Sequence, residues 1–104
     1  MNREETIKEI SKVLKRFSDI SVYLFGSSAR GDYRTDSDID ILILLPDYIT
    51  SKERVALESE ICGALLPVEL STDIEISPIM LPNKVWNQRI TPFTINVLKD
   101  RIAL

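Results

Sequence analysis

Residues 23–45 constrain the fold and chemistry of this chain more than any other segment. An apolar run ends at Gly26, a polar turn follows, and a second apolar run begins around Asp38 and Asp40. Residues two apart on a β-strand point to the same face, so we expect these two aspartates to stand side by side. Adjacent carboxylates repel each other and lose hydration unless a positive charge lies between them. The pattern therefore predicts a cation site at the start of a buried strand.

A divalent cation such as Mg²⁺ suits this position, because it takes oxygen ligands and leaves coordination positions open for phosphate. The Gly26-Ser27 turn would face the same place with backbone N–H groups and a hydroxyl, which suit phosphate oxygens. A calcium-binding EF-hand loop is excluded, because it needs glycine where Ile41 stands and glutamate where Asp47 stands. We therefore expect metal ligands and phosphate ligands to meet at one end of a sheet.

Two acidic residues compete for a third carboxylate position in the predicted β region 70–81. Asp73 and Glu75 would share one face of this strand. We favour Glu75, because it is flanked by Ile74 and Ile76, where an unpaired acid is costly and so more diagnostic of a site. Asp73 is the alternative. The role of Glu75 would be to complete the metal site or to act as general base toward an acceptor hydroxyl.

The hydrophobic periodicity predicts an α/β (α+β) fold, with a small mixed sheet flanked by helices. Expected helices cover residues 3–17, 27–31, 50–66 and a last segment that begins with Thr91 as N-cap and Pro92 at the first position. We expect the helix from residue 50 to stop at Pro67. Expected strands cover residues 20–25, 39–45 and 70–81. The chain of 104 residues should form one domain spanning residues 1–104.

Composition removes several function classes. The chain has no histidine and one cysteine, Cys62, which excludes serine–histidine catalysis, histidine metal sites and an internal disulfide. A net charge of −3 disfavours a nucleic-acid partner. No apolar run is long enough for a membrane span or signal core, so a cytoplasmic location is expected. A domain this small leaves little room for acceptor recognition, so a partner chain in a homo- or hetero-oligomer could complete the site.

The spacing of these residues resembles a known family signature. Gly26-Ser27, ten residues from Ser28 to Ser37, and then Asp38-Ile39-Asp40 resemble the motif of the nucleotidyltransferase superfamily that shares the polymerase-β palm. The fuller pattern is similar to its smallest branch, the minimal nucleotidyltransferases. This resemblance implies transfer of a nucleoside monophosphate, AMP from ATP or the equivalent from another NTP, with two Mg²⁺ ions held by three carboxylates.

The resemblance also assigns roles to individual residues and a partner. The metal ligands and catalytic residues would be Asp38, Asp40 and Glu75, with Asp73 as the runner-up for the third position. The nucleotide would be held by a group of small and basic residues in the turn: Gly26, Ser27, Ser28, Arg30 and Ser37. The acceptor would be a hydroxyl of a partner protein, plausibly a HEPN-domain toxin that this chain modifies as an antitoxin. The alternative is a catalytically inactive protein that keeps the fold and binds the nucleotide or the partner.

Overall fold

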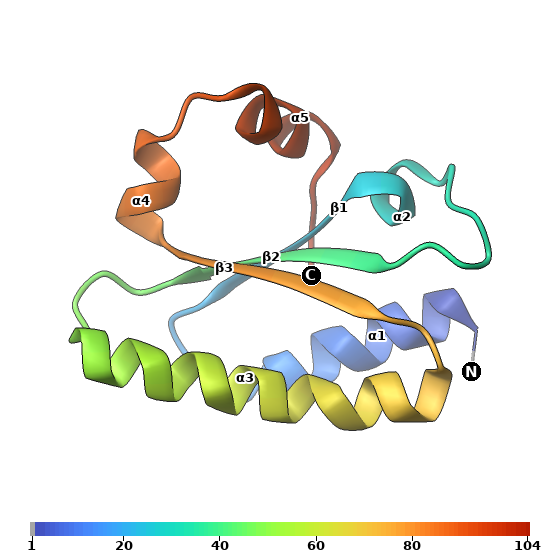
Figure 1. Ribbon diagram of the computed structural model, residues 1–104, viewed down its shortest axis with the longest axis horizontal. Coiled ribbons are helices and arrows are strands. Elements are labelled where there is room, and N and C mark those ends of the chain that lie inside the picture. Colours follow the sequence, from blue (N-terminus) through green and yellow to red (C-terminus); the bar gives the residue numbers. More distant parts are fainter. Residues whose placement is uncertain (1) are drawn as a thin grey trace.

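The protein is described by a computed structural model covering residues 2–104. A four-stranded sheet forms its centre, with strand order β3-β2-β1-β4 (Figure 1). β2 runs parallel to β3, whereas β1 is antiparallel to both β2 and β4. The predicted small mixed sheet is thus confirmed. The strands are β1 (Ser21–Phe25), β2 (Ile39–Leu45), β3 (Ile76–Pro82) and β4 (Ile102–Ala103).

Helices cover both faces of the sheet. Figure 1 shows α1 and α3 together on one face, with α2, α4 and α5 on the other. Within residues 2–104, no helix combines the length and the apolar character needed to cross a membrane. The helices are α1 (Arg3–Leu14), α2 (Gly26–Arg30), α3 (Ser51–Thr72), α4 (Asn83–Gln88) and α5 (Pro92–Asp100).

β2 is buried from both sides and divides the core in two. Its odd-numbered residues, such as Ile41 and Ile43, pack in the cluster formed with α1 and α3. Leu42 and Leu44 pack in a second cluster with Trp86 and Val97, residues of α4 and α5. Because side chains alternate along a strand, Asp40 lies on the same face as Leu42 and Leu44. The aspartate pair therefore opens toward the α2, α4 and α5 side of the sheet.

The predicted helix starts are confirmed by side-chain caps. The Asn2 side chain accepts a hydrogen bond from the Glu5 backbone N–H, at 2.8 Å. Thr50 and Glu53 form a reciprocal capping box at the start of α3. Thr91 caps α5, with proline at the first position as expected. These caps satisfy backbone N–H groups that have no partner inside the helix, so local sequence alone sets where these helices begin.

The predicted end of α3 is wrong. The helix passes through Pro67 and continues to Thr72. A proline inside a helix removes one backbone hydrogen bond and crowds the preceding turn. Here the last turns bury Val68 against the core on the same side as Ala64 and Leu65, and packing of this face outweighs the local penalty. The strand predicted from residue 70 accordingly begins only at Ile76.

Candidate active site

Gly26 brings the turn after β1 directly against Asp40. β1 and β2 are in register with Phe25 opposite Asp40, and Gly26 is the next residue. Gly26 has a φ of +71°, and a Cβ atom there would lie 2.6 Å from Asp40 Oδ2. At that separation the Asp40 carboxylate would have to move, so glycine suits both the left-handed conformation and the position of Asp40. The structure thus joins the two halves of the sequence motif, the Gly26-Ser27 turn and the aspartate pair.

The two aspartates form an electrostatically unfavourable pair. Partial burial raises the pKa of Asp40, and the neighbouring charge of Asp38 raises it further. Arg30 acts in the opposite direction and lowers the pKa of Asp40. Carboxylate oxygens that repel each other at the start of a buried inner strand are a suitable donor set for a hard divalent cation. The residues present therefore fit the metal that the sequence predicted.

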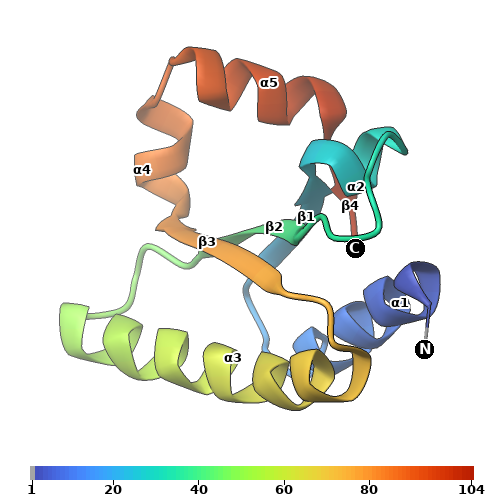
Figure 2. The same ribbon diagram turned by 45° about the vertical axis from the view of Figure 1, so that its right-hand side comes forward.

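Arg30 ends α2 and links it to α5. Its Nη1 donates to Asp100 Oδ2 at 3.1 Å, and its Nε donates to Asp32 Oδ2 at 3.2 Å. These hydrogen bonds raise the pKa of Arg30, with the Asp100 bond contributing most. Figure 2 shows α2 and α5 lying close together on the same side of the sheet. Arg30 is thus held close enough to act electrostatically on Asp40, while half of its side chain stays exposed to solvent.

Arg3 is a structural residue of the site that sequence reasoning missed. Its side chain is buried, and its guanidinium donates to Ser28 Oγ at 3.1 Å and to the Ser37 carbonyl at 2.6 Å. It also donates to the Arg34 carbonyl and lies over the Tyr33 ring. Two predicted phosphate ligands, Ser28 and Ser37, thus hold α1 to the turn and the loop. No local pattern signals this role, because the partners lie 25–34 residues away.

The structure does not group Glu75 with the aspartates. Within residues 2–104, no set of three or more Asp, Glu, His or Cys side chains could hold a metal ion. Glu75 is exposed, although its carbonyl accepts a hydrogen bond from the Ile39 N–H at 2.9 Å. Asp73 is the C-cap of α3 with a φ of +57°. Because α3 extends to Thr72, both acids lie in the connection before β3.

Ser77 is the side chain that β3 does bring to the aspartates. It pairs in register with Asp40, and its Oγ donates to Asp38 Oδ2 at 3.1 Å. Sequence reasoning missed this residue because it sought a charged group. The available signal was its position two residues after Glu75, which places both on one face of an extended strand.

Comparison with known proteins identifies the family. Residues 7–103 match the family described as nucleotidyltransferase domain. The chain belongs to this family. The nucleotidyltransferase fold and the expected α/β class are thus confirmed, and the Gly26 turn with Asp38 and Asp40 is the sequence motif by which the chain resembles it.

Two proteins of Methanocaldococcus jannaschii that carry the name protein adenylyltransferase are similar to this nucleotidyltransferase. One is 44% identical over 74% of this chain and 73% of its own length. The other is 36% identical over 96% of this chain and 95% of its own length. A solved toxin–antitoxin structure with AMP-PNP has a similar fold, with a TM-score of 0.56 and 23% identity over 92% of this chain and 69% of that chain.

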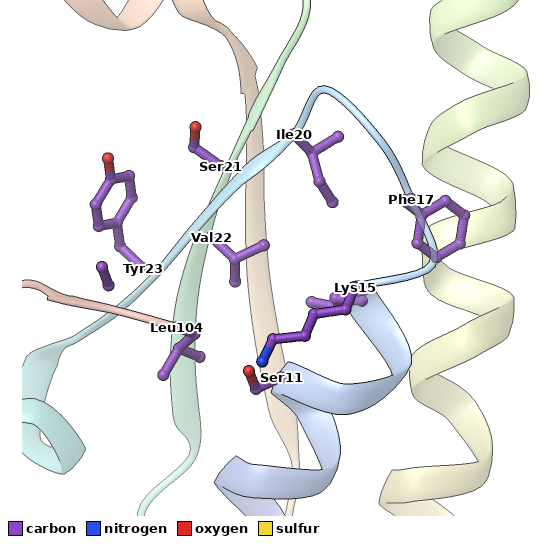
Figure 3. A pocket seen from close by; sticks show the side chains of 10 residues that line it. Ser11, Lys15, Phe17, Ile20, Ser21, Val22, Tyr23 and Leu104 are labelled. Atoms are coloured by element: carbon purple, nitrogen blue, oxygen red, sulfur yellow. The ribbon is translucent and has the colours of Figure 1, made fainter.

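A separate pocket of this nucleotidyltransferase has a volume of about 370 Å³. It lies between the end of α1, the start of β1 and the residue after β4, and Figure 3 shows Lys15, Ser11 and Leu104 among its lining side chains. None of the residues predicted for the nucleotide site lines it. This pocket is therefore separate from the predicted nucleotide site.

Proposed function

We propose that this nucleotidyltransferase moves AMP from ATP to a hydroxyl of a partner protein, in a reaction that depends on Mg²⁺. The observation that carries this proposal is the close approach of Gly26, which has no side chain, to the Asp40 carboxylate. The backbone at Gly26 thus lies beside the mutually repelling carboxylates of Asp38 and Asp40. The name protein adenylyltransferase carried by two relatives supports AMP as the transferred group. AMP-PNP in a protein of similar fold supports an adenine nucleotide as substrate.

Asp38 and Asp40 would hold the two Mg²⁺ ions. When bound, these ions would neutralise the triphosphate and favour in-line displacement at the α-phosphorus. The backbone N–H groups of Gly26 and Ser27 would donate to phosphate oxygens. Arg30 would supply a positive charge to the same anion. Ser28 and Ser37 contribute through Arg3, which fixes the turn and the loop that carry the other ligands.

Glu75 remains our first candidate for the third carboxylate, with Asp73 as the alternative. The backbone of Glu75 already lies beside β2. The proposal therefore requires only that the Glu75 side chain turn toward the aspartates when the nucleotide binds. The acceptor oxygen would form a bond to the α-phosphorus, and the bond to the bridging oxygen of pyrophosphate would break. The acceptor proton would pass to Glu75 as general base. Pyrophosphate and an AMP-ester of the acceptor are then the products.

A partner protein is proposed as the source of the acceptor. The aspartates lie on the side of the sheet that carries α2, α4 and α5, where an acceptor would have to approach them. The similar fold of a toxin–antitoxin protein supports a toxin partner, which we propose to be of the HEPN type. The net charge of −3 is a reason to prefer a protein acceptor over nucleic acid.

The test uses ATP labelled at the α- or γ-phosphorus, incubated with the chain, Mg²⁺ and a candidate HEPN toxin. We expect α-label on the toxin, no γ-label, and release of pyrophosphate. Asp38→Asn and Asp40→Asn should each abolish labelling. A toxin that is bound and neutralised without becoming labelled would instead support the inactive binding protein, the alternative favoured by the absence of a three-carboxylate group in residues 2–104.

A further inference from the structure

We propose that Ser77 is a positioning residue that orients the Asp38 carboxylate for metal binding. Ser77 lies on β3 opposite Asp40, beside the aspartate pair. This inference rests on the proposed function, because it assumes that Asp38 binds the metal ion. Ser77 contacts Asp38 and acts through it.

The register of the sheet places Ser77 on the aspartate face. β2 and β3 run parallel, with Asp40 opposite Ser77 and Leu42 opposite Ile79. Neighbouring strands lie about 4.8 Å apart, so a side chain at position 77 is within reach of both carboxylates. Leu42 and Ile79 belong to one hydrophobic cluster, which shows that paired residues on these strands share a face. Unlike Glu75, Ser77 lies inside the strand, where backbone pairing fixes its direction.

The hydrogen bond supplies an orientation that Asp38 lacks by itself. Rotation of a carboxylate about its last side-chain bond is broad, so the plane of its oxygens needs an external partner. Ser77 Oγ donates to Asp38 Oδ2 at 3.1 Å, which leaves Oδ1 for a metal ion. Carboxylates that bind metals are commonly held by such second hydrogen-bonding partners, and losing one weakens metal binding by about tenfold or more.

A neutral hydroxyl is also the group that the charge of the site favours. The ionised form of Asp40 is disfavoured by partial burial and by the nearby charge of Asp38. A third anion at position 77 would add to this repulsion in the absence of metal. A hydroxyl donates to one carboxylate and brings no charge, so Ser77 holds Asp38 without adding to the repulsion between the aspartates. If Ser77 had no role in orienting Asp38, replacing it should leave metal binding unchanged.

The experiment measures Mn²⁺ affinity of the nucleotide-free chain by electron paramagnetic resonance. We expect Ser77→Ala to weaken Mn²⁺ binding about tenfold, and Ser77→Thr, which keeps the hydroxyl, to stay within about twofold of wild type. Melting temperature in EDTA is recorded for each variant, because a purely structural role would lower it without changing Mn²⁺ affinity. Wild-type Mn²⁺ affinity in a folded Ser77→Ala variant would overturn the inference.

Two further variants separate this inference from the proposed function. Asp38→Asn should remove Mn²⁺ binding. Equal Mn²⁺ affinity of wild type and Asp38→Asn would overturn the metal site itself. Loss of binding in Asp38→Asn with unchanged binding in Ser77→Ala would overturn the role of Ser77 alone. Ser77→Asp removes the donating hydroxyl and adds a negative charge beside the aspartate pair, and we expect a lower melting temperature in EDTA than for Ser77→Ala. Equal melting temperatures of these two variants in EDTA would contradict the assigned position.

Discussion

Replacing Gly26 with alanine should damage nucleotide binding far more than it damages the fold. Gly26 has a φ of +71°, and its missing Cβ would lie 2.6 Å from Asp40 Oδ2. Gly31 provides a matched control, because it has a φ of +84° and no atom within 4 Å of its missing Cβ. Both substitutions carry the same conformational penalty, but only Gly26→Ala displaces the Asp40 carboxylate.

The stability change can be worked out from these two sites. A left-handed conformation at a non-glycine residue costs roughly 1–2 kcal/mol. Alanine also reduces the entropy of the unfolded chain, which offsets about 0.5 kcal/mol. The net loss of about 1 kcal/mol corresponds to a melting temperature lower by roughly 4–8 °C in a domain of this size. The clash at Gly26 adds little to this loss, because the carboxylate of Asp40 can rotate away from the new methyl group.

The assay is calorimetric titration of AMP-PNP in the presence of Mg²⁺, with melting temperatures measured on the same samples. Gly26→Ala should bind AMP-PNP at least tenfold more weakly, since a displaced Asp40 no longer holds the ion that binds the triphosphate. Gly31→Ala should melt at a similarly reduced temperature and bind AMP-PNP like wild type. Equal AMP-PNP affinity in the two variants would refute the reasoning that Gly26 makes room for Asp40.

Three other predictions concern the acids and Arg3. The pKa of Asp40 is raised in the folded chain, so its ionisation opposes folding as pH rises from the unfolded-state pKa to this higher value, and the penalty is constant above it. In EDTA at pH 7, Asp40→Asn should melt about 2–4 °C higher than wild type, which corresponds to about 0.5 kcal/mol. This difference should vanish in melts at a pH below the carboxyl pKa in both states. Glu75→Gln should reduce pyrophosphate release strongly and Asp73→Asn only slightly, and the reverse ranking would move the third carboxylate to Asp73. Arg3→Met should lower the free energy of unfolding in urea by about 2 kcal/mol, because the Ser28 hydroxyl and the Ser37 carbonyl lose a charged donor; an unchanged midpoint would contradict this role.

The sequence by itself determined those features that depend on neighbouring residues. Alternation along a strand put Asp40 in line with Leu42 and Leu44, and the structure has this arrangement. The caps at Thr50 and Thr91 begin their helices where the pattern predicted. Each cap is set by hydrogen bonds between residues three apart, and the alternation follows from the backbone geometry of a strand, so a short stretch of sequence contains the whole cause.

Tertiary structure decided the features whose partners are far apart in the chain. Pro67 remains helical because Val68 packs on the core, and this packing moves the start of β3 to Ile76. That shift leaves Glu75 before the strand and brings Ser77, through the parallel register of β2 and β3, to Asp38. Strand register is fixed by burial of a whole face and not by any one residue. The sequence could therefore point to the aspartate pair, whereas only the fold could choose the side chain beside it.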